Sequence, residues 1–305
     1  MPLQLGVDLG GTKIAAVVLG ADGRVAWEDR LATPRDDYAG TIAAIASLVE
    51  AGERAAGAAC TVGIGMPGAI SPATGLVKNA NSVWLIGQPL LDDLRNRLRR
   101  DVRIANDANC FAVSEAADGA AAGADVVFGV IVGTGTGGGI AVHGRVLTGP
   151  NAIAGEWGHN PLPWAGDEER PGPPCYCGQH GCIETFLSGP GLKGEHARRT
   201  GLTCEPRDIV ARAAEGDAAA AETLARYERR MARALASVIN LLDPDVIVLG
   251  GGLSHIQRLY DRVPRLWGEW IFAAGRDESV RTSLRPARHG AASGVRGAAW
   301  LWPDE

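Results

Sequence analysis

The sequence has no long hydrophobic run, no cluster of basic residues and little net charge. Its longest apolar run, Val126–Val132, is far shorter than the roughly 18 residues that a membrane-spanning helix needs. No basic residue precedes Lys13, so the N-terminus does not resemble a secretory signal. The formal net charge is −5 and no stretch concentrates Lys and Arg, which argues against a nucleic-acid or anionic-membrane surface. We therefore expect a soluble, cytoplasmic protein.

What the sequence has in excess is glycine, with 42 residues in a chain of 305, and it also has six cysteines. The glycines fall in short clusters between apolar runs, which excludes a collagen repeat. The length predicts two domains with a substantial core. Because disulfides are unlikely to persist in a reducing compartment, a group of cysteines indicates a metal site instead.

The apolar patterning predicts an α/β protein with two similar halves. A strand, a glycine-rich turn and a second strand occur at residues 6–19 and again at 130–142. The simplest interpretation is a duplicated core with a cleft between an N-terminal domain, residues 1–118 plus 290–305, and a C-terminal domain, residues 119–289. We expect strands at residues 3–9, 12–19, 24–32, 61–65, 102–105, 126–132, 140–147 and 246–249, and helices at 38–53, 90–100, 106–117, 218–241 and 291–302, the last packing on the first domain.

The glycine-rich turn from Asp8 to Lys13 is suited to binding phosphate. Successive glycine amides can form a concave set of donors, to which Thr12 adds a hydroxyl and Lys13 a positive charge. It is not a P-loop, because Thr precedes Lys and a strand follows instead of a helix. The alternative is a plain β-hairpin, which needs no such flanking residues.

Two further glycine clusters follow predicted strands. The segment 133–139 contains G-x-G-x-x-G at Gly133, Gly135 and Gly138, which is a nicotinamide-dinucleotide fingerprint only when a helix follows. Here a strand is predicted, so we interpret the segment as a second phosphate turn. Gly250–Gly252 permits close approach of a flat ligand such as adenosine, although an ordinary strand-to-helix turn is equally consistent.

Polar residues suited to catalysis and metal binding stand at two other places. Asp107 follows a strand, where its carboxylate could accept a proton from an attacking hydroxyl, although Asn106-Asp107 is also an ordinary helix cap. One imidazole and three thiolates would form a closed tetrahedral zinc set, unless the grouping is accidental; the residues are His159, Cys175, Cys177 and Cys182. Glu156 and Glu184 flank this knot and could bind sugar hydroxyls.

With these motifs assembled, the chain resembles the ROK family of bacterial sugar kinases, and within it the fructokinase (mannokinase) group. The motifs that carry the resemblance are DLGGTK at 8–13, GMPGAISPATG at 65–75, KNANS at 78–82, ANDANC at 105–110, GTGTGGG at 133–139, GEWGHNPLPW at 155–164, CYCGQHGCIE at 175–184, DPDVIVLGGGLS at 243–254 and SGVRGAAWLWP at 293–303.

The resemblance implies an actin-like ATPase (ribonuclease H-like) fold of two α/β domains with a central cleft and a zinc-binding knot. It assigns Asp107 as the catalytic base and Asn81, Asn106, Asp107, Glu156, His159 and Glu184 to the sugar. It assigns a structural Zn²⁺ to His159, Cys175, Cys177 and Cys182. ATP, with Mg²⁺, is assigned to Gly6, Val7, Asp8, Leu9, Gly10, Gly11, Thr12, Lys13, Gly133, Thr134, Gly135, Thr136, Gly137, Gly138, Gly139, Gly250, Gly251 and Gly252.

The resemblance further implies ATP-dependent phosphorylation of the 6-hydroxyl of D-fructose by a homodimeric enzyme that binds neither nucleic acid nor membrane. The main alternative is a kinase of the same family acting on N-acetylglucosamine, glucose, mannose or N-acetylmannosamine. A sugar-responsive regulator would need a DNA-binding module, for which we expect no room because the first predicted strand begins at about Leu3. A nicotinamide oxidoreductase depends on the G-x-G-x-x-G pattern alone.

Overall fold

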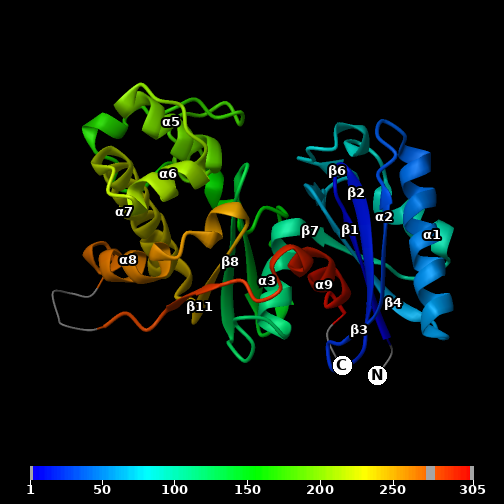
Figure 1. The fold of residues 1–305 in the computed structure, drawn as a ribbon. Coiled ribbons are helices and arrows are strands. Elements are labelled where there is room, and N and C mark those ends of the chain that lie inside the picture. Colours follow the sequence, from blue (N-terminus) through cyan, green and yellow to red (C-terminus); the bar gives the residue numbers. More distant parts are fainter. Residues whose placement is uncertain (1–2, 273–278, 303–305) are drawn as a thin grey trace. The chain divides into compact units, whose positions relative to one another are not determined.

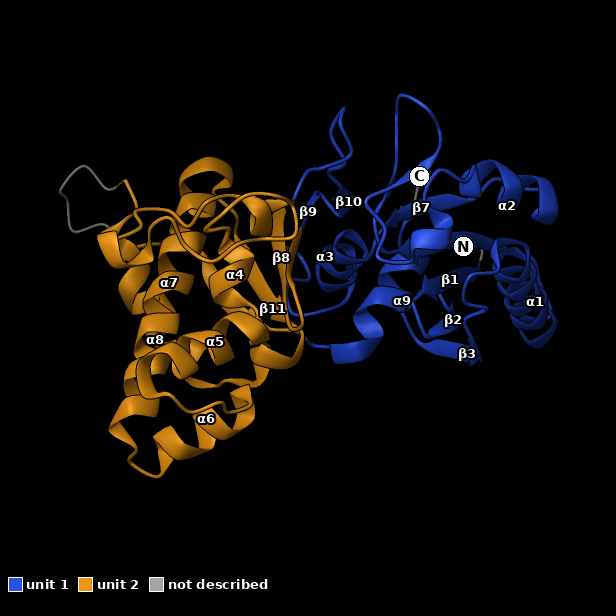
Figure 2. Ribbon diagram, turned by 90° about the horizontal axis from the view of Figure 1, so that it is seen from above, with its two compact units in different colours: residues 1–123, 139–155, 288–305 blue, residues 124–138, 156–287 orange. Residues whose placement is uncertain are grey.

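A computed structural model of the protein describes residues 3–272 and 279–302. Residues 1–2 and 303–305, at the two ends of the predicted N-terminal domain, and residues 273–278 of the predicted C-terminal domain lie outside the described residues. The chain divides into two compact units (Figure 2). Unit 1 comprises residues 1–123, 139–155 and 288–305, and unit 2 comprises residues 124–138 and 156–287. The sequence predicts residues 139–155 in the second domain, whereas the structure groups them with the first unit.

Unit 1 is built on a five-stranded mixed sheet (Figure 1). Its strand order is β3 (Val25–Ala32), β2 (Lys13–Leu19), β1 (Leu3–Leu9), β4 (Cys60–Met66) and β7 (Arg103–Asn106). Strands β1 to β3 form the predicted antiparallel meander, while β4 and β7 continue the sheet in parallel. Helices α1 (Tyr38–Ala56), α2 (Leu90–Leu98), α3 (Asp107–Ala117) and α9 (Ser293–Ala299) complete the unit, with a small β5–β6 pair (Ala69–Ile70 and Val77–Lys78) and the single turn η1 (Val83–Leu85).

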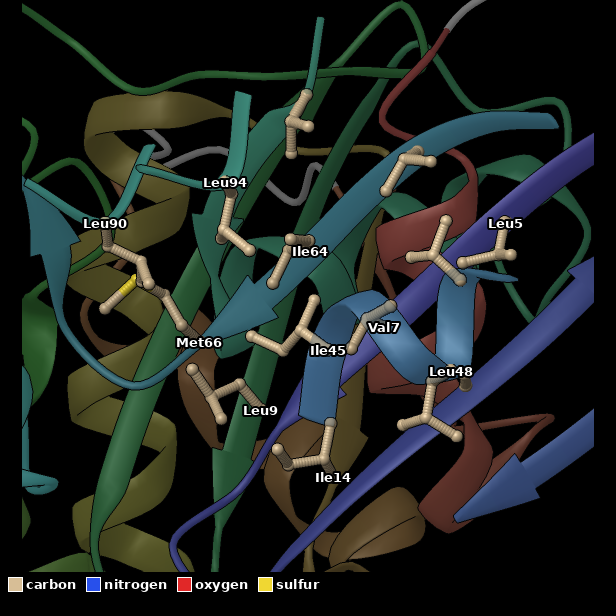
Figure 3. Close-up of a cluster of buried hydrophobic side chains, with 14 of the residues drawn as sticks. Leu5, Val7, Leu9, Ile14, Ile45, Leu48, Ile64, Met66, Leu90 and Leu94 are labelled. Carbon is tan, nitrogen blue, oxygen red and sulfur yellow. The ribbon is translucent and has the colours of Figure 1, made fainter. Parts of the chain in front are cut away.

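Alternate residues of β2 enter separate apolar clusters, as the two-residue period of a strand requires. Ile14 and Val18 join the main core with Ile45 and Leu48 of α1 (Figure 3). Val17 and Leu19 instead cluster with Ala299 of α9. The sheet is therefore covered on both faces, which explains why β1 and β2 are almost continuously apolar in sequence.

Helix α9 lies unusually close to the sheet because two glycines face it. Gly6 of β1 and Gly63 of β4 are register partners in the parallel pair. A Cβ atom at Gly6 would stand 2.1 Å from the carbonyl oxygen of Val295, and one at Gly63 would stand 1.9 Å from that of Ala298. Contacts of α9 with β1, β2 and β4 confirm the predicted packing of the last helix on the first domain, although the helix is shorter than predicted.

The second sheet has the strand order β10 (Arg145–Val146), β9 (Thr136–Val142), β8 (Val126–Val132), β11 (Val246–Gly250) and β12 (Ser283–Pro286). The division between the units falls within β9. Unit 2 contains helices α4 (Ile183–Leu187), α5 (Gly189–Thr200), α6 (Pro206–Ala214), α7 (Ala218–Leu242) and α8 (Arg258–Leu266). It also contains the short turns η2 (Trp157–His159), η3 (Asp167–Glu169), η4 (Gly252–His255) and η5 (Trp267–Glu269). A further short turn, η6 (Gly290–Ala292), belongs to unit 1. Within residues 3–272 and 279–302, no helix has both the length and the apolarity to span a bilayer.

The second glycine-rich turn is shorter than the sequence predicts. Strand β9 begins at Thr136, so the three consecutive glycines that follow belong to a strand and only the first part of the motif forms the turn. The turn is closed by a hydrogen bond of 2.9 Å from the Gly133 amide to the Gly135 carbonyl. Because a strand follows, the arrangement lacks the helix that a nicotinamide fingerprint requires.

Candidate active site

Two carboxylates stand where strands of the unit 1 sheet end. Asp8 is near the end of β1, and Asp107 begins α3 directly after β7. Strand β4 lies between β1 and β7 and is parallel to both, so both residues come to the same carboxyl edge of the sheet. Burial, followed by the negative charge of Asp107, raises the pKa of Asp8 to about 6. Asp107 itself is exposed.

Asn106 has the helix-capping role that the sequence analysis considered. Its Oδ1 accepts a hydrogen bond of 2.9 Å from the Ala108 amide, and its Nδ2 donates one of 3.1 Å to the Gly68 carbonyl. Asp107 Oδ1 also accepts a hydrogen bond from the Ala108 amide, at 2.8 Å. These bonds fix the backbone around Asp107 and join it to the Met-Pro-Gly loop after β4.

The first glycine turn is held through its carbonyl groups. The Gly10 carbonyl accepts a hydrogen bond of 2.7 Å from the Thr33 hydroxyl, and the Gly11 carbonyl accepts one of 3.0 Å from Arg35 Nε. A Cβ atom at Gly11 would lie 3.8 Å from the Ser82 hydroxyl, so the loop that carries the exposed Asn81 borders this turn. The turn and the predicted sugar-binding loop are thus neighbours within unit 1.

Three residues that the resemblance assigns to ATP have packing positions in this structure. The side chains of Val7 and Leu9 are fully buried in the main core. Gly6 lies against α9, as described above. Their contribution to the turn is structural, because they fix the end of β1 from which Asp8 extends.

In unit 2 the other two glycine turns line one cavity of about 1110 Å³, slightly above the usual range for small-molecule sites. Gly133 and Thr134 come from the turn between β8 and β9, and Gly252 comes from the segment after β11. The remaining lining comes from α5, from the loop after it and from α6, and it includes Gly189, Pro190, Lys193, Thr203, Glu205, Pro206 and Arg207. The cavity therefore joins two predicted nucleotide motifs that are about 120 residues apart in sequence.

Sequence reasoning missed the α5 contribution to this cavity, although a local signal is present. Ser188 caps α5 by accepting a hydrogen bond of 3.2 Å from the Gly191 amide, and Pro190 occupies its first turn. The first amide of α5, that of Gly189, donates a hydrogen bond of 2.7 Å to the Gly133 carbonyl. The Ser-Gly-Pro segment could therefore have predicted the start of this helix. The contact of the helix with a turn far away in sequence could not be predicted.

His159 and three cysteines form a cluster with the spacing of zinc ligands. The ligand atoms of His159, Cys175, Cys177 and Cys182 all lie within 4.8 Å of one another. The Cys177 and Cys182 Sγ atoms are 3.6 Å apart, and Cys175 Sγ is 3.5 Å from His159 Nδ1. Sulfur ligands around a tetrahedral zinc ion are separated by about 3.8 Å, so the donor set and the distances fit this metal.

Backbone hydrogen bonds pre-form the loop that carries these cysteines. The Cys175 amide donates to the Gln179 carbonyl at 2.8 Å, and the Gly178 amide donates to the Cys175 carbonyl at 3.0 Å. A hydrogen bond with the Gln179 backbone, followed by those with neighbouring cluster groups, lowers the pKa of Cys177 to about 7. Burial, followed by the nearby Cys177 thiol, raises that of Cys182 to about 12.

Glu184 connects the cysteine loop to the second glycine turn. It lies in α4, two residues after Cys182, and its Oε2 accepts a hydrogen bond of 2.8 Å from the Thr136 amide. The predicted sugar residues thus form two groups, one on each unit. Asn81, Asn106 and Asp107 belong to unit 1, and Glu156, His159 and Glu184 belong to unit 2.

The sequence profile of the ROK family matches residues 4–305. The chain belongs to the ROK family. The N-acetyl-D-glucosamine kinase of Erwinia tasmaniensis is 41% identical over 300 residues, which cover 97% of this chain and 98% of that protein. That of Escherichia coli O139:H28 is 40% identical over 98% of this chain and 99% of its own.

Solved structures of ROK proteins match this ROK chain along its whole length. The ROK hexokinase of Thermus thermophilus superimposes with a TM-score of 0.85 at 32% identity and covers 98% of this chain and 97% of its own. A ROK family glucokinase from Streptomyces griseus, solved in complex with glucose and AMPPNP, gives a TM-score of 0.74 at 28% identity and covers 98% of both chains. The two α/β units are consistent with the predicted actin-like ATPase fold.

Proposed function

We propose that this ROK protein transfers the γ-phosphoryl group of ATP to the 6-hydroxyl of N-acetyl-D-glucosamine. The observation that supports this sugar is the end-to-end similarity, at 38 to 41% identity, to proteins named N-acetyl-D-glucosamine kinases. The sequence-based expectation of fructose as substrate is not supported by these relatives. They favour instead the alternative that the sequence left open, a kinase of the same family that acts on N-acetylglucosamine.

The cavity of unit 2 supports a nucleotide as the second substrate. Glycine turns leave backbone amides accessible for phosphate, and a cavity of about 1110 Å³ accommodates an adenosine moiety. Lys193 lies at this cavity and forms an ion pair of 2.5 Å with Glu205, which joins α5 to the start of α6. We propose that Gly133, Thr134 and Gly252 contact the nucleotide.

Asp107 is the proposed general base. Its exposed carboxylate at the start of α3 would accept the proton of the sugar hydroxyl as the oxygen attacks phosphorus. Asp8 and Asp107 are oxygen ligands at one sheet edge and fit Mg²⁺, which supplies charge neutralisation for the phosphates when bound. The pKa of about 6 at Asp8 leaves this carboxylate mostly ionised at neutral pH.

We propose that His159, Cys175, Cys177 and Cys182 hold a structural zinc ion. Four protein ligands leave no open coordination position, so the ion would stabilise the loop and take no part in phosphoryl transfer. The loop in turn supports Glu184, which follows it in α4 and is one of the residues proposed to hold sugar hydroxyls.

The test is a coupled assay of ADP release with ATP and a panel of sugars. N-acetylglucosamine is expected to give the highest kcat/KM, with fructose and glucose at least about tenfold lower because each lacks contacts that the acetamido group provides. Identification of N-acetylglucosamine 6-phosphate by mass spectrometry and NMR would verify the position of transfer. A higher kcat/KM for fructose would refute the proposed sugar and leave the kinase assignment intact.

A further inference from the structure

Tyr176 lies between two proposed zinc ligands, Cys175 and Cys177, and its side chain contacts a third, His159. Its hydroxyl oxygen is 2.9 Å from His159 Nε2, and the two rings meet edge to face with centroids 5.0 Å apart and planes at 88°. The residue is nevertheless 79% exposed. A tyrosine that is so open to solvent, with its hydroxyl hydrogen-bonded to a proposed zinc ligand, is positioned to meet a ligand of its own.

The proposed zinc site fixes the direction of this hydrogen bond. His159 Nδ1 faces Cys175 Sγ at 3.5 Å, so Nδ1 is the atom that would bind the ion. The proton of a neutral, metal-bound imidazole then resides on Nε2, which donates it to the Tyr176 oxygen. The Tyr176 hydroxyl therefore keeps its own proton for a second partner.

The neighbouring sugar-contact candidates on unit 2 cannot supply such a proton. Glu156 immediately precedes η2, which ends at His159, and Glu184 lies in α4 two residues after the proposed ligand Cys182, so both carboxylates belong to the segments that meet at the cysteine loop. Ionised carboxylates only accept hydrogen bonds, so they suit sugar hydroxyls, which donate. The carbonyl oxygen of an N-acetyl group is an acceptor and needs a donor. Among these side chains, Tyr176 offers a hydroxyl whose proton remains available.

We propose that Tyr176 is a specificity-determining residue whose hydroxyl donates a hydrogen bond to the acetamido carbonyl of an N-acetylated hexosamine. This inference rests on the proposed function and extends it to the residue by which the enzyme would discriminate N-acetylglucosamine from glucose. In glucose a hydroxyl replaces the acetamido group, and a carboxylate can accept a hydrogen bond from that hydroxyl. Loss of the Tyr176 hydroxyl should therefore weaken the N-acetylated sugar selectively.

The variant Tyr176→Phe removes the hydroxyl and keeps the ring. Expected is a fall of roughly 3- to 10-fold in the ratio of kcat/KM for N-acetylglucosamine to kcat/KM for glucose, as for one lost hydrogen bond. Equilibrium binding of each sugar, measured calorimetrically without ATP, should show the same selective loss. Zinc content per chain and the melting temperature are measured for every variant, so that damage to the loop is recognised.

Tyr38→Phe is the matched control, because the Tyr38 hydroxyl also has one side-chain partner, Asp93, at 2.7 Å, but lies in unit 1 on α1. It should leave the sugar ratio unchanged. An unchanged ratio in zinc-replete Tyr176→Phe, or an equal loss for both sugars, would overturn the assignment of Tyr176. If the wild-type protein does not phosphorylate N-acetylglucosamine, it is the proposed function that fails, and this is established before any variant is made.

Discussion

At the scale of single residues, the two acids of unit 1 have different environments and therefore different proposed tasks. Asp8 is partly buried and its pKa is raised to about 6, which suits a group that holds a cation. Asp107 is exposed at the first position of α3, after a cap residue that fixes its backbone. Sequence alone predicted the position of Asp107 but could not separate the cap from the base, because both functions use Asn or Asp before a helix.

Replacing Asp107 by Asn should lower kcat by about 10²- to 10⁴-fold and change sugar affinity little, because the amide keeps the shape but cannot accept a proton. Rates from the coupled assay and sugar binding by calorimetry measure the two effects separately. Asp92→Asn, a change of the same kind in the exposed first turn of α2, is the control and should be silent. A kcat for Asp107→Asn near that of the wild type would contradict the role as base.

At the scale of elements, the contact between α9 and the unit 1 sheet depends on the absence of side chains at Gly6 and Gly63. Gly63→Ala should destabilise the protein by about 2 to 4 kcal/mol, because its Cβ would stand 1.9 Å from the Ala298 carbonyl and the helix must shift. Denaturant unfolding of both proteins measures the difference. Gly268→Ala, at a glycine with nothing within 4 Å and no left-handed backbone, is the control and should change stability by less than about 1 kcal/mol. Equal midpoints for the two variants would be inconsistent with a tight α9 contact.

Elements with a clear period were predictable, whereas α5, which opens with Gly-Pro-Gly, and α8, which contains Pro264, were not predicted. The meander β1–β3 and helix α7 follow from apolar alternation and from helical spacing, respectively. The start of β9 was misjudged because residues 136–139 are Thr-Gly-Gly-Gly, a composition typical of turns. The last of these glycines has a packing role in the strand, because a Cβ atom at Gly139 would lie 2.1 Å from the Ala108 carbonyl of α3.

At the scale of the whole molecule, the same contact explains why the domain boundary could not be read from the sequence. Strand β9 begins in unit 2, and its later residues belong to unit 1 because they lie against α3. Short β10 also contacts α3. A boundary inside a strand leaves no change of composition and no linker to detect. The cavity of unit 2, the proposed nucleotide site, was equally hidden, since it depends on the contact of α5 with the Gly133 turn.

The cysteine loop gives a prediction about the stability of the whole protein. Metal analysis should find about one zinc per chain, and removing it with a chelator should lower the melting temperature, because binding energy at a four-ligand site is also folding energy. The sugar KM should rise as well, since Glu184 follows this loop in α4 and His159 is itself one of the proposed ligands. Cys177→Ser should mimic chelation, whereas Cys204→Ser, outside the cluster, should retain the metal. A metal-free protein that is equally stable and active would rule out a structural zinc. If zinc is lost and stability falls while the sugar KM is unchanged, the cysteine loop supports the fold of unit 2 without positioning the sugar residues.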